Sequence, residues 1–135
     1  MAEIFPGAGP KFSINATGLY VLGDASDGLV STFSLQLVDP AASFVGSLVV
    51  QARSRVPQAR TGKISIGGID VTADDVAFKT IAYWDPGIPQ YSSAAITAAT
   101  IILIPASGWE IGLNVTALSA GTLNAYVQPV YGAAA

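Results

Sequence analysis

The sequence predicts an all-β protein, an antiparallel β-sandwich or jelly roll of roughly eight strands with an irregular N-terminal arm. Three observations support this fold class. Apolar residues recur at every second position in several segments, which is typical of strands with one buried face. Clusters of Gly, Pro, Asp and Ser separate these segments at short intervals. No segment keeps a helical period, and a chain of 135 residues is expected to form a single domain.

The first ten residues, MAEIFPGAGP, contain two Pro and two Gly, which argue against both helix and strand. We therefore expect an extended arm over residues 1–10 and one sandwich domain over residues 11–135. Such an arm can lie against a neighbouring molecule, and its apolar residues Ile4 and Phe5 would then be the anchors.

Alternation with a period of two places the next strands. Short strands are expected at residues 12–16 and 19–22, and longer ones at residues 29–38 and 44–53, each followed closely by Gly or Pro. Residues 76–84 are apolar on both sides of the pattern. This indicates a strand in the middle of the sandwich or at a subunit contact.

Residues 63–72, KISIGGIDVT, predict a tight hairpin, because Gly-Gly suits a two-residue turn between alternating strands. A single strand with a bulge at the glycines is the alternative. Residues 92–100 mix Ala with Ser, Thr and Ile. We favour an extended conformation there, because residues 101–104 continue as an apolar strand.

Residues 108–129, GWEIGLNVTALSAGTLNAYVQP, carry the clearest pattern of the chain. Apolar residues alternate with polar or small ones on both sides of a break at residues 117–121, which ends in Gly. The pattern predicts a hairpin of two antiparallel strands, each with one face in the core and one wetter face. The inward positions of the long strands define the predicted core: Phe33, Leu35, Leu37, Leu48, Val50, Trp109, Ile111, Leu113, Val115, Leu123 and Val127.

Composition restricts the function. Only 11% of the residues are charged and 51% are hydrophobic, so we expect a surface that another protein partly covers; a neutral surface rich in Ser, Thr and Asn is the alternative. The net charge of −3 argues against a nucleic-acid partner. The longest apolar run is too short to span a membrane, and no secretory signal is visible. The chain has neither Cys nor His, so we expect no enzymatic activity and no cofactor.

Two groups of charged residues are candidate sites. Four of the six basic residues lie in one segment and can pair with carboxylates of a partner, although a solvated loop is the alternative: Arg53, Arg55, Arg60 and Lys63. Three carboxylates are close enough in sequence to hold Ca²⁺, but no EF-hand pattern surrounds them, so solvated acids and no metal site are expected: Asp70, Asp74 and Asp75.

Aromatic residues form a third group, which would offer a sugar-stacking surface if its members were exposed. Both Trp residues lie within strand patterns, and core packing is expected for them. The group comprises Tyr83, Trp84, Tyr91, Trp109, Tyr126 and Tyr131.

Residues 108–123, GWEIGLNVTALSAGTL, the preceding strand at residues 96–103, ITAATIIL, and the whole-chain character together resemble one family. That character is a short chain without Cys, rich in Ala, Gly, Ser and Thr, with an irregular N-terminal arm. The sequence is similar to the capsid decoration (cement) proteins of tailed bacteriophages, which are small β-sandwich virion proteins.

The resemblance implies a structural virion protein, made in the host cytoplasm, that binds the major capsid protein on the outside of an icosahedral head and stabilises the shell. It also implies a homotrimer, which agrees with residues 101–104 being apolar on both faces. No catalytic residues are implied. The alternatives are a phage tail or baseplate protein, and a carbohydrate-binding β-sandwich module. The expected contacts with the capsid or another partner are Ile4, Phe5, Arg53, Arg55, Arg60 and Lys63.

Overall fold

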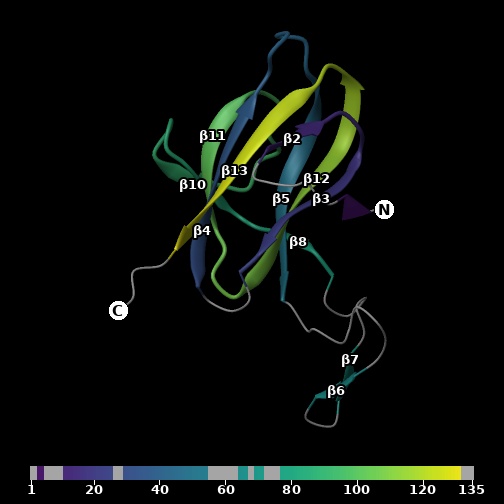
Figure 1. Ribbon diagram of the computed structural model, residues 1–135, viewed down its shortest axis with the longest axis vertical. Coiled ribbons are helices and arrows are strands. Elements are labelled where there is room, and N and C mark those ends of the chain that lie inside the picture. The colour runs from purple at the N-terminus through teal and green to yellow at the C-terminus, as the bar shows by residue number, and fades with distance from the viewer. Residues whose placement is uncertain are drawn as a thin grey trace.

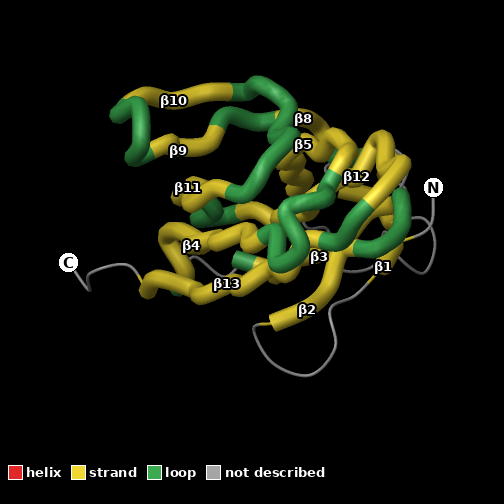
Figure 2. The backbone as a smooth tube through the Cα atoms, turned by 90° about the horizontal axis from the view of Figure 1, so that it is seen from above, coloured by secondary structure: helices red, strands yellow, loops and turns green. Residues whose placement is uncertain are grey.

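The computed structural model describes residues 3–4, 11–25, 29–54, 64–66, 69–71 and 77–131. These residues form two β-sheets packed face to face, so the predicted all-β sandwich is confirmed (Figures 1 and 2). The described part of the two sheets contains eleven strands, more than predicted, because several are only two or three residues long. Strands this short are too brief to produce a visible alternation in the sequence.

The two sheets have unequal size, and all their described pairings are antiparallel except that of β1 with β3. The five-stranded sheet contains, in spatial order, β1 (Glu3–Ile4), β3 (Gly18–Asp24), β12 (Trp109–Ala120), β5 (Val45–Ser54) and β8 (Lys79–Thr80). The six-stranded sheet contains β10 (Gln90–Ser92), β9 (Tyr83–Asp85), β11 (Thr100–Pro105), β4 (Val30–Val38), β13 (Leu123–Tyr131) and β2 (Lys11–Ile14). A separate hairpin contains β6 (Ile64–Ile66) and β7 (Ile69–Val71).

The core lies between the two sheets and is built from alternate residues of the long strands. Ten of the eleven predicted core residues are buried. Trp109 is the exception, since 44% of its surface is exposed, and the prediction that it packs in the core is wrong. It is the first residue of β12, directly after the Gly108 turn. Alternation predicts the side of a strand on which a residue lies, but not how far the opposite sheet extends to cover it.

The predicted hairpin at residues 108–129 is also wrong, although both of its strands exist. β12 belongs to the five-stranded sheet and β13 to the six-stranded sheet, so the chain arches from one layer to the other. Gly121 makes this arch with a φ of 79°. A Cβ at this position would lie only 2.5 Å from the Cα of Phe44, so glycine is required both for the dihedral angle and for the close approach.

The predicted strand at residues 76–84 is divided between the two sheets. β8 pairs with β5 in one layer, and β9 pairs with β10 and β11 in the other. Between them, the Ile81 amide donates a hydrogen bond to the Val50 carbonyl at 3.0 Å. The apolar residues on both sides of the sequence pattern therefore belong to strands of two different sheets, and not to one strand that is buried on both faces.

The segment at residues 93–99 joins β10 to β11 of the six-stranded sheet and also contacts β5 of the five-stranded sheet. Residues 92–100 form no helix, in agreement with the preference for an extended conformation, but strand structure is interrupted, because β10 ends at Ser92 and β11 begins at Thr100. Between these strands, Ile96 exchanges two backbone hydrogen bonds with Leu48 of β5, at 2.7 and 2.9 Å. One residue pair of the main chain thereby links the segment to the opposite sheet.

Two local predictions concern short strands. The hairpin at residues 63–72 is confirmed, because Ile66 pairs with Ile69 and two residues connect β6 to β7. Figure 1 shows this hairpin apart from both sheets. The exclusion of strand from residues 1–10 is wrong for Glu3 and Ile4, which pair in parallel with Leu19 and Tyr20 of β3. The Pro residues of the arm lie outside this two-residue strand, and the rest of the arm lies outside the described residues.

The outward side of β12, predicted to be the wetter face, is buried over much of its length. Glu110 is only 2% exposed, and Asn114 is also buried. The Arg53 side chain is 10% exposed, and its Nε donates a hydrogen bond of 2.7 Å to Glu110 Oε1. Its guanidinium also lies over the Phe78 ring, 4.4 Å from the centroid. A buried ion pair next to an aromatic ring therefore replaces the expected solvated face.

Candidate interaction surface on the six-stranded sheet

The outward face of the six-stranded sheet carries apolar side chains that the described part of the chain leaves uncovered. In β11, Ile102 and Ile104 point into the core, whereas Ile101 is 50% exposed and Leu103 is half-buried. The apolar pattern on both faces of this strand therefore supplies the core on one side and the outer surface on the other. A sandwich strand needs only one buried face, so the second is available for contact with another molecule.

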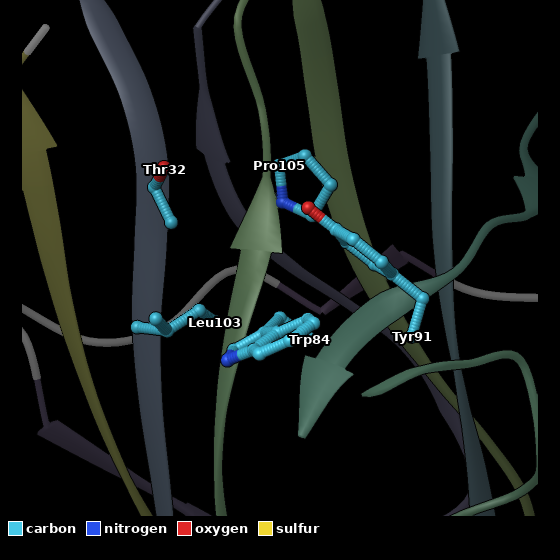
Figure 3. Close-up of a pocket in the computed structure, with 5 residues that line it drawn as sticks. All are labelled: Thr32, Trp84, Tyr91, Leu103 and Pro105. Carbon is cyan, nitrogen blue, oxygen red and sulfur yellow. The ribbon is translucent and has the colours of Figure 1, made fainter. Parts of the chain in front are cut away.

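A hollow lies on this face where β4, β9, β10 and β11 meet. Its lining residues are Thr32, Trp84, Tyr91, Leu103 and Pro105, and its volume is about 340 Å³ (Figure 3). The register explains the grouping, because Trp84 pairs with both Tyr91 and Leu103. The two rings meet edge to face, with centroids 5.0 Å apart and planes at 68°. The aromatic pair thus forms a corner, which the apolar residues of β11 close.

A second hollow of about 460 Å³ lies farther along the same face, between β4 and β13. Ser34 belongs to its lining and pairs with Leu103 of the first hollow, so the two hollows adjoin across β4. The other lining residues are Gln36, Tyr126, Val127, Gln128 and Pro129. Beyond it, at the β2 edge, the Lys11 ammonium lies 5.5 Å from the centre of the Tyr126 ring.

Neither hollow has a charged residue in its lining. The nearest described carboxylate along β9 is that of Asp85, which accepts a hydrogen bond from the Gly87 amide at 2.9 Å and so serves the turn that follows. The surface is therefore suited to a neutral partner, recognised by shape, apolar contact and hydrogen bonds to uncharged groups.

Of the predicted partner-binding residues, only Arg53 has a described side chain, and it lines neither hollow. Arg53 is engaged by Glu110 within the chain, so the structure assigns it a structural role, and its contact with a partner stays a prediction. For Ile4 the structure describes only the backbone. The remaining predicted contacts lie outside the described residues: Phe5, Arg55, Arg60 and Lys63.

The aromatic residues divide between core and surface differently from the prediction. Tyr83 is buried and its hydroxyl donates a hydrogen bond to the Ala94 carbonyl at 3.0 Å. Trp84, expected in the core, lies instead in the wall of the outer hollow. Tyr126 and Tyr131 are exposed. The sequence feature that pointed to the outer face was the run at residues 101–104, since its second apolar face had to contact something.

The carboxylates proposed as solvated acids lie largely outside the described residues. Asp70 is described only by its backbone, which pairs with that of Ser65, and Asp74 and Asp75 are not described. Within the described ranges, no group of three or more acidic residues gathers in a way that holds a metal ion.

Comparison of the chain with protein-family models, with curated proteins and with solved structures found no match. The described part of the chain contains no helix that is long and apolar enough to span a membrane.

Proposed function

We propose that this protein is a structural component of a phage virion, a decoration protein that binds the outside of the assembled icosahedral capsid and stabilises it. The observation that carries the proposal is the partly apolar outer face of the six-stranded sheet, centred on Ile101, Leu103 and Trp84, whose two hollows have no charged residue in their linings. This face supports a role in protein assembly, as do the low content of charged residues and the family resemblance.

The physical basis of the stabilisation is mass action. A protein that binds the assembled shell more tightly than it binds free capsid subunits lowers the free energy of the assembled shell relative to that of the free subunits. Each decoration protein then adds to the cost of releasing a subunit, because its buried apolar contacts must be exposed to water again.

The hairpin of β6 and β7 supports self-association. Within the described residues it pairs with no other strand, and an isolated two-stranded hairpin is marginally stable in water. Its backbone register pairs Ile64 with Val71 and Ile66 with Ile69. A neighbouring copy that packs against the hairpin would stabilise it, and we propose the homotrimer as the assembled form.

Particles that lack the protein should lose their DNA at a lower temperature than decorated particles, because the shell then lacks the binding free energy of the added contacts. DNA release on heating, followed with an intercalating dye, measures this difference. Equal release from both kinds of particle would refute the proposed stabilisation. Electron microscopy of the same particles separates a head protein from a tail or baseplate protein.

A matched pair of variants tests the proposed face. Ile101→Glu places a charge in the outer face of the six-stranded sheet, and Val45→Glu places one at a comparably exposed position, 57%, in the opposite sheet. We expect Ile101→Glu to reduce particle binding at least about tenfold, which corresponds to about 1.4 kcal/mol, and Val45→Glu to bind as the wild type does. Undiminished binding by Ile101→Glu would exclude this face as the contact.

Sedimentation equilibrium at micromolar concentration should give the mass of a trimer, three times 13.7 kDa. Closed cyclic assembly is the common way to bury such a surface. A monomer mass would limit trimer formation to the particle surface, which contradicts self-association in solution, and a dimer mass would contradict the threefold proposal itself.

A further inference from the structure

We infer that the hollow lined by Thr32, Trp84, Tyr91, Leu103 and Pro105 is a binding site for an extended, proline-containing segment of a partner protein. The hollow is part of the outer face that carries the proposed function, so the inference rests on that proposal and names the kind of partner segment; peptide binding is measured on the isolated protein and therefore fails or succeeds separately from capsid stabilisation.

The shape of the aromatic pair favours an angular ligand. Trp84 and Tyr91 meet at 68°, so they present a corner and not a flat platform. Figure 3 shows the Tyr91 ring reaching toward Pro105, while Trp84 lies beside Leu103. A polyproline II helix has three residues per turn and therefore a three-sided cross-section, whose ridge fits such a corner. A sugar ring, in contrast, stacks best on one flat exposed ring.

The polar groups of the hollow are suited to the same ligand. The Trp84 indole can only donate a hydrogen bond, and the Tyr91 hydroxyl can donate as well. The Thr32 hydroxyl already donates to Ser31 Oγ at 3.5 Å. Among the described residues, neither the Trp84 indole nor the Tyr91 hydroxyl donates to another group of the chain. A polyproline II segment has no internal hydrogen bonds, and its prolines lack an N–H. It therefore presents carbonyl acceptors to a site in which the Trp84 indole and the Tyr91 hydroxyl can donate.

The extent of the surface sets the length of the segment. The two adjoining hollows stretch from β10 across β9, β11 and β4 to β13, which is four strand spacings. At about 4.8 Å for each spacing this is about 19 Å. A polyproline II helix rises about 3.1 Å per residue, so about six residues span the two hollows. Because neither hollow has a charged residue in its lining, the segment is expected to be uncharged.

Fluorescence of Trp84 provides a direct test. The chain has two Trp residues, so a Trp109→Phe variant makes Trp84 the only indole in the protein. The full-length variant is titrated with an eight-residue oligoproline peptide, and a Gly-Ser peptide of equal length is the control. We expect a saturable change in Trp84 emission with a Kd below about 1 mM for oligoproline, and no saturation with the control peptide.

Two further variants locate the binding. Tyr91 and Tyr131 are similarly exposed, at 64% and 68%, but only Tyr91 lines the hollow. Tyr91→Ala should weaken oligoproline binding at least about tenfold, while Tyr131→Ala should leave it unchanged. The inference is overturned if oligoproline fails to saturate, if Tyr91→Ala binds it as the parent does, or if a neutral oligosaccharide saturates the emission of Trp84 and oligoproline does not.

Discussion

Replacing Arg53 with Met should lower the free energy of unfolding by about 3–5 kcal/mol, the usual result of removing one member of a buried ion pair. The guanidinium contacts the Glu110 carboxylate through two nitrogen atoms, each 2.7 Å from Oε1. The Glu110 side chain is only 2% exposed, so water cannot solvate its carboxylate once the Arg53 cation is removed. Urea unfolding followed by circular dichroism measures the difference.

The double variant Arg53→Met, Glu110→Gln provides the control for this prediction. Removing both charges at once should recover much of the lost stability, because the uncompensated carboxylate is then absent. Arg53→Lys should fall between the wild type and Arg53→Met, since Lys keeps the charge but not the planar fork. If Arg53→Met stays within about 1 kcal/mol of the wild type, the pair behaves as a surface salt bridge and the assignment of a buried pair is wrong.

Replacing Leu113 with Ala should lower the free energy of unfolding by about 3–5 kcal/mol, as for a fully buried leucine whose removal leaves a cavity. Leu113 lies in the middle of β12, is entirely buried, and pairs with Val50 on one side and Tyr20 on the other. Neighbouring strands fix the backbone on both sides, so the site has little freedom to collapse around the missing atoms. Thermal or urea unfolding provides the measurement.

Trp109 on the same strand is the matched control. The change of Trp109 to Ala removes more atoms than the change of Leu113 to Ala. However, 44% of the Trp109 surface is already exposed. Trp109→Ala should therefore cost only about 1 kcal/mol, within the usual range for single substitutions. Equal losses in the two variants would mean that Trp109 packs as tightly as a core residue, in contradiction to its place at the end of the sandwich.

The sequence was sufficient to identify strands and their buried faces, but not the partners of the strands. The inward positions of β4, β5 and β12 follow directly from alternation, because a pleated strand turns successive side chains to opposite sides. The same alternation arises whether two consecutive strands pair as a hairpin or arch between two layers. For β12 and β13 the second arrangement holds, and only the close approach of Gly121 to Phe44 distinguishes it.

The candidate surface could be anticipated only in part. The run at residues 101–104 indicated an outer apolar face, since one strand cannot bury both of its sides in one core. The hollow itself could not be anticipated, because Trp84 and Thr32 are far apart in the chain and meet through the sheet order β9–β11–β4. The Arg53–Glu110 pair could not be predicted from the sequence for the same reason. Its members are 57 residues apart and pair across β5 and β12.

The lengths of the outermost strands have a consequence for solubility at high concentration. In the described part of the two sheets, the outermost strands are β1, β8, β10 and β2, which contain only two, two, three and four residues. The interior strands β4, β5, β12 and β13 contain nine to twelve. A strand from another molecule can therefore form only a few main-chain hydrogen bonds with any of these four strands, which disfavours aggregation by pairing along them. Crowded copies of this chain should consequently associate through side chains on sheet faces, where the contact is selective, and not by extending a sheet from one molecule into the next.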